Sequence, residues 1–287
     1  MRFKLLPALL LLSIGVFAQE RVHVSGRIVN EKGEAVEYVQ IGVPKLRIGT
    51  VSTVDGRFEM ELPCDTLEFF HVSYQAASYP VTGPADDVVV VLQEQELPPA
   101  VFIGGETRKK YLLRSGRDVL GRMGSIGFSL QEGYSSGREI GSVARARKPF
   151  LVQDIIFSVQ SNHIPDCVAS INIYRIEGDK ESFVNVLHRP IYFDVVVSDK
   201  TWDYEIHPEE TLLLEPGRYF IAFQIVGWDE EAMRDYLARP AEERKPYAMC
   251  TYFNVFLKSS YVRSAALGEM QYLPVNIGVA VRGLEYQ

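Results

Sequence analysis

Runs in which apolar and polar residues alternate one by one constrain this 287-residue chain most strongly. Val24 and Ile28 fall on one face of an early run, and Phe58 and Met60 fall on one face of a later run. A period of two suits a β-strand with one buried face, whereas an amphipathic helix needs a period near 3.6. The first third of the chain is therefore predicted to be built from strands.

Turn residues separate these runs. The stretch from Asn30 to Gly33 lies between two of them, and the Asp55-Gly56 pair lies between two others. Both residues of such a pair tolerate the positive φ of a tight turn, so Asp55-Gly56 predicts a β-hairpin. Further strands over 67–74 and 88–92 bring the total to about seven in roughly 75 residues, which is typical of a small β-sandwich.

This region contains a characteristic set of residues: turn glycines, strand-forming apolar residues and a Val-Ser-Tyr triplet. The set comprises Gly26-Arg27-Ile28-Val29-Asn30, Gly33, Val36, Val39, Ile41, Val43, Gly49-Thr50, Asp55-Gly56-Arg57-Phe58 and Val72-Ser73-Tyr74. Over residues 21–93 it resembles the carboxypeptidase regulatory-like domain, a transthyretin-like sandwich of exported bacterial proteins. The family usually has Asp or Asn where this chain has Thr53, and a Gly where it has Ala76-Ala77. The resemblance implies a spacer or interaction module without an active site.

Strand patterns return in the second half of the chain. They cover residues 150–160, 167–176, 190–197, 201–206, 218–226, 250–258 and 275–284. Their spacing and aromatic content predict a larger antiparallel sandwich, jelly-roll-like, which resembles exported proteins in which a jelly roll follows the regulatory-like domain. One helix is predicted within it, with Asp229 as N-cap and Pro240 at its end. The expected fold class is all-β, with two sandwiches and one inserted helix.

The N-terminal residues predict export. A basic start precedes an apolar run from Leu5 to Ala18 that is too short to cross a bilayer, as in a secretory signal peptide. We expect a signal peptide over 1–18, cleaved between Ala18 and Gln19. After its removal no segment approaches the roughly 20 apolar residues of a membrane helix. The expected location is the periplasm or the cell surface.

A basic stretch separates two acidic regions. Residues 106–148 carry ten basic and four acidic side chains, although the whole chain has a net charge of −7. We predict a small sandwich over 19–95, a basic linker over 96–124 and the large sandwich over 125–287. Complementary charge predicts that the stretch lies against both acidic domains and orients them through screened attraction. An anionic glycan or lipid head group is the alternative partner, and export argues against nucleic acid.

One nucleophile motif occurs. Residues 133–137 match G-x-S-x-G around Ser135, and Asp194 or Asp203 and then His207 follow in hydrolase order. The nucleophile elbow needs a buried strand before the serine and a helix after it. Polar residues precede Ser135 and no helical pattern follows, so a turn is the favoured interpretation.

Metal and redox chemistry have little support in the sequence. His207 and Glu210 form an H-x-x-E pair, but no later histidine supplies a third zinc ligand. The cysteines Cys64, Cys167 and Cys250 contain no C-x-x-C pair. We therefore predict no catalytic residue, no metal and no cofactor.

Trp202, Trp228 and Tyr236 are the candidate ligand-binding residues, because aromatic rings on a sandwich rim stack on sugars, although core or rim packing is the favoured interpretation. The leading hypothesis is an exported, non-catalytic structural or interaction protein of the cell envelope, with a protein or a glycan as partner. The alternatives are a glycan-binding protein that uses the C-terminal sandwich and a serine hydrolase that uses Ser135.

Overall fold

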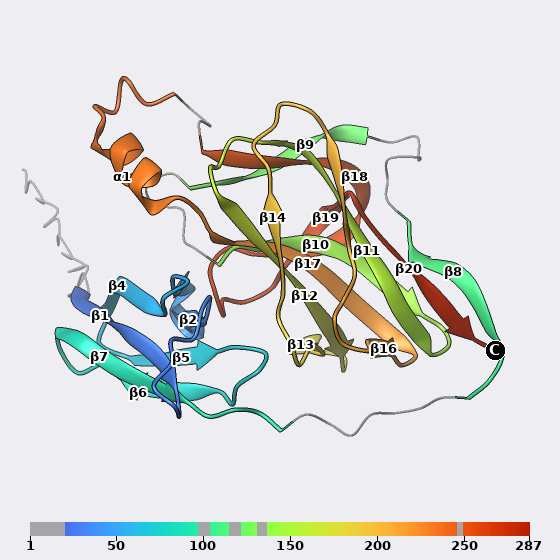
Figure 1. The fold of residues 1–287 in the computed structure, drawn as a ribbon, viewed down its shortest axis with the longest axis horizontal. Coiled ribbons are helices and arrows are strands. Elements are labelled where there is room, and N and C mark those ends of the chain that lie inside the picture. The colour runs from blue at the N-terminus through green and yellow to red at the C-terminus, as the bar shows by residue number, and fades with distance from the viewer. Residues whose placement is uncertain (1–20, 97–103, 115–121, 131–136, 246–248) are drawn as a thin grey trace, which may run out of the picture.

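A computed structural model describes residues 21–96, 104–114, 122–130, 137–245 and 249–287. These residues form an all-β sandwich protein with one α-helix, as predicted (Figure 1). The strands divide into a small unit, β1 to β7, and a large unit, β8 to β20. The predicted signal peptide and its Ala18–Gln19 cleavage point lie outside the described residues.

The small unit contains two sheets. The three-stranded sheet has the order β4-β1-β7, from β1 (Arg21–Asn30), β4 (Arg57–Pro63) and β7 (Ala85–Leu92). The four-stranded sheet has the order β3-β2-β5-β6, from β2 (Gln40–Val43), β3 (Ile48–Val51), β5 (Thr66–Phe70) and β6 (Ala77–Pro80). The 3-10 helix η1 (Pro44–Leu46) connects β2 to β3. Alternating apolar residues such as Val24 and Phe58 pack between the two sheets, as the sequence predicted.

The predicted hairpin at Asp55-Gly56 is wrong, although the turn is present. Gly56 has a φ of +76°, and its N–H donates to the Thr53 carbonyl. The flanking strands separate, because β3 pairs with β2 while β4 pairs with β1. Thr53 supports this turn, since its hydroxyl oxygen accepts from the Arg57 N–H at 3.0 Å. The turn therefore passes the chain from one sheet to the other.

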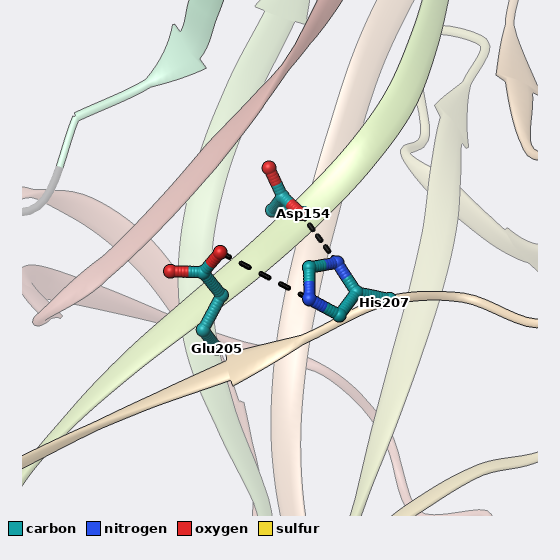
Figure 2. Close-up of side chains that lie close together, drawn as sticks. All are labelled: Asp154, Glu205 and His207. Carbon is teal, nitrogen blue, oxygen red and sulfur yellow. Dashed lines mark ion pairs between the residues drawn. The ribbon is translucent and has the colours of Figure 1, made fainter.

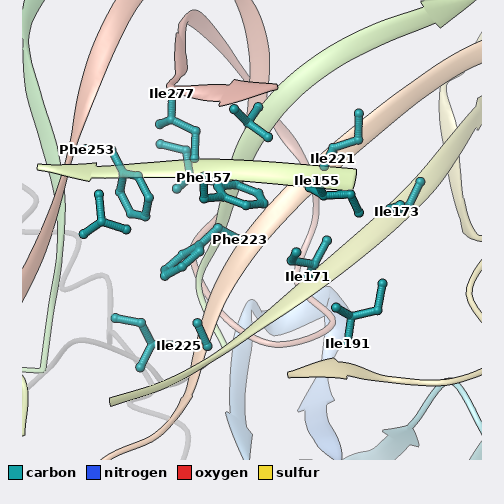
Figure 3. Close-up of a cluster of buried hydrophobic side chains, with 14 of the residues drawn as sticks. Ile155, Phe157, Ile171, Ile173, Ile191, Ile221, Phe223, Ile225, Phe253 and Ile277 are labelled. Carbon is teal, nitrogen blue, oxygen red and sulfur yellow. The ribbon is translucent and has the colours of Figure 1, made fainter. Parts of the chain in front are cut away.

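The large unit is a 13-stranded antiparallel sheet whose main path is β13-β12-β17-β10-β18-β11-β20-β8. Its strands are β8 (Thr107–Leu113), β9 (Arg122–Ser129), β10 (Glu139–Ala146), β11 (Phe150–Asn162), β12 (Cys167–Glu177), β13 (Ser182–Asn185), β14 (Ile191–Val195), β15 (Trp202–Ile206), β16 (Leu213–Leu214), β17 (Gly217–Gly227), β18 (Cys250–Arg263), β19 (Gln271–Ile277) and β20 (Val279–Tyr286). Because β18 pairs with β10 at one end and β11 at the other, the sheet folds back on itself. Aromatic and branched residues such as Phe157, Phe223 and Phe253 fill the space enclosed (Figure 3).

The basic stretch is not the linker that the sequence predicted. Within 96–124, residues 107–113 form strand β8, which pairs along β20 at the edge of the large sheet. Lys110 contacts Glu285 of that strand at 2.6 Å. Backbone hydrogen bonds therefore hold this part of the stretch, and charge attraction is a smaller addition.

The helix α1 (Glu230–Ala238) agrees with its sequence signals. The Asp229 carboxylate accepts from the Ala232 N–H at 2.9 Å, which caps one of the free donors of the first turn. Met233 and Tyr236 are buried on its inner face. In the part of the chain that the structure describes, no helix is long and apolar enough to cross a membrane.

Candidate functional site

The two units meet through apolar contacts at close range. Val51 of the small unit packs with Val226 and Ala266 of the large unit in one buried cluster. A Cβ on Gly49 would lie only 2.3 Å from the Ala266 carbonyl oxygen, so glycine permits this approach of two backbones. The units are therefore docked, and the docked face belongs to strands β2 and β3.

A buried polar network continues the interface. Arg263 pairs with Glu139, its cross-strand neighbour, and Glu139 is fully buried. The Arg263 Nη2 also donates to the Tyr174 hydroxyl at 2.7 Å and, across the interface, to Gln40 Oε1 at 3.2 Å. Burial is the largest influence and opposes the charge of Arg263, but the Glu139 carboxylate and the Tyr174 hydroxyl together outweigh it and raise the pKa of the guanidinium. The arginine is thus charged while it holds a residue of the other unit.

Gln224 links the same network to Gln40 a second time. The Gln40 Nε2 donates to the Gln224 Oε1 at 3.3 Å, and the Asn172 Nδ2 donates to the same oxygen at 3.2 Å. Gln40 and Gln224 are both buried. Buried polar groups of this kind fix one arrangement of two surfaces, because any displacement leaves some of them unpaired.

His71 occupies a second buried position at the interface. Its Nδ1 accepts from the Ser73 N–H at 3.2 Å, so the neutral ring carries its proton on Nε2, which lies 3.3 Å from the Tyr192 hydroxyl. Burial lowers the pKa of His71 to about 4. The Tyr38 ring packs edge-on against Tyr192, with centroids 5.0 Å apart. A neutral histidine is therefore part of the docked interface.

A cleft of about 1130 Å³ opens beside this interface. One wall is the outer face of the β4-β1-β7 sheet, and the other is the segment that leads from β17 into α1. Asp229, the cap of α1, donates its N–H to the Pro165 carbonyl and so ties this wall to the turn before β12. Ligand sites favour such positions between units, and the volume matches a small-molecule or peptide site.

The lining of the cleft combines aromatic, apolar and charged side chains. Trp228 and Tyr38 contribute rings, and Val89 contributes an apolar side chain that is 65% exposed. Tyr38, Asp87 and Asp166 all have positive φ, at 51°, 57° and 46°. Such backbone is uncommon outside glycine and is concentrated at functional sites.

The three aromatic candidates do not form one surface. Trp228 lines the cleft and also packs against the main core. Trp202 is 53% exposed on β15, where its Nε1 donates to Ser198. Tyr236 is buried, and its hydroxyl donates to the Lys245 carbonyl at 2.8 Å. As a ligand-stacking residue Tyr236 is therefore a wrong prediction, because it is held in the core by α1.

A second polar cluster, which sequence patterns missed, joins Asp154 of β11 to Glu205 of β15 and to His207, which directly follows β15 (Figure 2). His207 Nδ1 lies 2.5 Å from Asp154 Oδ1, and His207 Nε2 lies 4.0 Å from Glu205. An imidazole and two carboxylates are donors that divalent transition metals accept. Arg282 of β20 already pairs with both Asp154 and Glu205, so its guanidinium occupies the carboxylates that a metal would need.

The same cluster contains His207, the histidine of the hydrolase hypothesis, and gives it a partner other than the predicted one. His207 is oriented by Asp154, a carboxylate that the hydrolase hypothesis did not assign to it. Asp203, one of the two predicted partners, instead accepts from the Ser158 hydroxyl at 2.7 Å. Ser135 lies outside the described residues. Glu210, the partner of His207 in the H-x-x-E pair, accepts from the backbone N–H groups of residues 188 and 189.

The cysteines carry no disulfide. Cys64 is exposed, whereas Cys167 and Cys250 are buried, and all three are free. Burial raises the pKa of the Cys167 thiol to about 12, so this thiol is unreactive at neutral pH.

Comparison with known proteins adds little to this description. No family model matches the chain, and a search of the curated proteins finds no match. Among solved structures, a DUF3823 family protein from Bacteroides ovatus is 10% identical, with 72% of this chain and 97% of that chain covered and a TM-score of 0.21. A DUF3823 family protein from Parabacteroides merdae is 10% identical, with 90% and 98% covered and a TM-score of 0.21. The infectious bursal disease virus Gx strain structure is 12% identical, with 99% and 63% covered and a TM-score of 0.28. TM-scores this low support no inference about family or function.

The fold and the site by themselves define the class of this protein. It is an all-β protein with a cleft between two docked units.

Proposed function

We propose that this chain is an exported, non-catalytic interaction protein of the cell envelope that binds its partner in the cleft between the two units. The observation that carries the proposal is the cleft itself, formed between units that buried contacts hold in one arrangement. A site of this kind binds without first paying for domain closure. The signal-like N-terminus and the resemblance of residues 21–93 to an interaction module support the same class.

A matched pair of variants tests the proposal. Val89→Lys places a long charged side chain on the cleft wall, whereas Val184→Lys makes the same change on β13, outside the cleft. Both valines are exposed, so neither change disturbs a core. We expect capture of envelope components by the mature protein to be lost with Val89→Lys and retained with Val184→Lys. Equal capture by both variants would contradict binding in the cleft.

A glycan-binding function is the second candidate, and the position of Trp228 on the cleft wall favours it. The sugar face would stack on the exposed part of the indole ring. Binding on a glycan array should then be lost with Trp228→Phe combined with Val89→Lys and retained with Trp202→Ala. The reverse dependence would place the sugar on β15 instead.

A further inference from the structure

The charges that line the cleft are unevenly compensated. Its two arginines both face Asp55: the Arg57 Nε lies 2.9 Å from an Asp55 carboxylate oxygen, and the Arg27 Nε donates to the Asp55 backbone oxygen at 3.3 Å. Asp55 also accepts from the Thr53 hydroxyl, and its pKa is lowered chiefly by this bond. The positive charge of the lining is therefore gathered around a single carboxylate.

Four further carboxylates lie on the walls of the cleft. Glu59 of β4 lies 3.9 Å from the His23 Nδ1, and among the described residues the other three have no such neighbour. Asp87 comes from β7 of the small unit, while Asp166 and Glu230 come from the large unit, before β12 and in the first turn of α1. All three residues are exposed. Across the described ranges, none of their carboxylates makes a hydrogen bond or an ion pair. The two walls thus present uncompensated negative charge to the same space.

The aromatic rings of the cleft make a second, independent contribution. Trp228 is half-buried where the wall passes into α1, and the half-buried Tyr38 lies close to Gly227. The face of an aromatic ring attracts ammonium and guanidinium groups, and the indole of tryptophan attracts them more strongly than the rings of tyrosine and phenylalanine. Carboxylates and an indole around one cleft favour the same kind of ligand, a cation with an apolar stem.

A single metal ion does not fit this lining. Among the described residues, a group of three histidine, cysteine or carboxylate donors within 4.8 Å of one another occurs at Asp154, Glu205 and His207 and not in the cleft. The carboxylates of the cleft are instead distributed over two walls of a large space. A neutral glycan would leave them uncompensated. Several cationic side chains along one extended segment would pair with them.

We propose that the cleft binds a lysine- or arginine-bearing extended segment of a polypeptide partner, which rests on the proposed function of the cleft. Asp87, Asp166 and Glu230 supply the charge complementarity, and Trp228 packs against the stem or head of a cationic side chain. The arrangement combines attraction across two walls with an aromatic contact, so affinity falls when salt is raised.

The test uses the mature chain and a short alternating Lys-Ala peptide, with Gln-Ala and Glu-Ala peptides of the same length. A Trp202→Phe background leaves Trp228 as the single tryptophan, so its emission reports binding at the cleft. In this background, Asp87→Asn, Asp166→Asn and Glu230→Gln are combined. A matched control combines Asp179→Asn, Glu209→Gln and Glu242→Gln, which are exposed, lie outside the cleft and change the net charge equally.

The Lys-Ala peptide should shift the Trp228 emission, and the Gln-Ala and Glu-Ala peptides should not. The cleft triple variant should bind it about tenfold more weakly, because three exposed charge contacts are lost, while the matched control should stay within about twofold. Equal weakening by both triples would reduce the effect to overall acidity and overturn the proposal. Preference for the neutral peptide, or for a neutral glycan, would also overturn it. If Val89→Lys still abolished capture in that case, the cleft would keep its function and lose only the assigned ligand charge.

Discussion

Two of the clusters that pair arginine with carboxylates differ in where the charges lie. In the interface network the side chains of Arg263 and Glu139 are 9% and 0% exposed. In the cluster on β15, β11 and β20, the side chains of Arg282 and Glu205 are 38% and 42% exposed. Water screens Arg282 and Glu205 of the second cluster, although its Asp154 side chain is only 11% exposed, and water does not reach the first cluster. The same kind of pairing therefore fixes the two units in the buried network, and contributes little stability where water reaches it.

The largest effect is expected from Arg263→Met. It leaves Glu139 buried without its counter-charge, and breaking a buried pair costs about 3–5 kcal/mol of unfolding free energy. The double variant with Glu139→Met should recover part of the loss, because no unpaired charge remains. Urea denaturation of the four proteins of this cycle measures both quantities. A loss below about 1 kcal/mol for Arg263→Met would mean that the network is hydrated.

The next effect concerns His71 and acid. Its pKa is about 4 when folded, against an ordinary value of 6.5, so the unfolded chain takes up the proton first as pH falls. The stabilisation is complete above pH 6.5 and is lost between pH 6.5 and 4, by about 3 kcal/mol over that range. Unfolding free energies of the wild type and of His71→Gln, measured from pH 7.5 to 4, separate the contribution of His71 from other effects of acid. Parallel curves for the two proteins would contradict it.

The smallest effect is expected from Arg282→Met. Its side chain is 38% exposed and pairs with the exposed Glu205 and the buried Asp154, and Asp154 keeps His207 as a neighbour after the change. The expected loss is about 0–1 kcal/mol at 0.1 M salt and less at 1 M salt. Denaturation at both salt concentrations checks this. A loss above about 2 kcal/mol, independent of salt, would make this cluster equivalent to the buried one and remove the contrast between them.

The sequence predicted the fold class and the helix because both depend on local patterns. Alternation identified strands such as β1 and β4, and Asp229 and Pro240 marked the two ends of α1. Strand β8 was missed because its TRKKYLL sequence is highly charged, and an edge strand exposed along most of its length needs little apolar alternation.

The interface could not be predicted in the same way. Alternation places Val39 and Ile41 on one face of their strand, and nothing in the local pattern marks Gln40, between them, as buried. It is buried because the opposite face of the strand docks on Gln224 and Arg263, which lie more than 180 positions away in the chain. The cleft carboxylates gave no motif for the same reason, since Asp87 and Asp166 come together only when the units dock.

Small-angle scattering of the mature chain at 0.1 M and 1 M salt tests the central claim, that buried contacts fix the two units around a preformed cleft. The Debye length falls from about 10 Å to about 3 Å over this range, which removes most surface attraction and leaves buried hydrogen bonds intact. The account predicts the same radius of gyration at both concentrations. A larger radius at high salt with unchanged β content would show that screened surface charge orients the units, and would contradict the account.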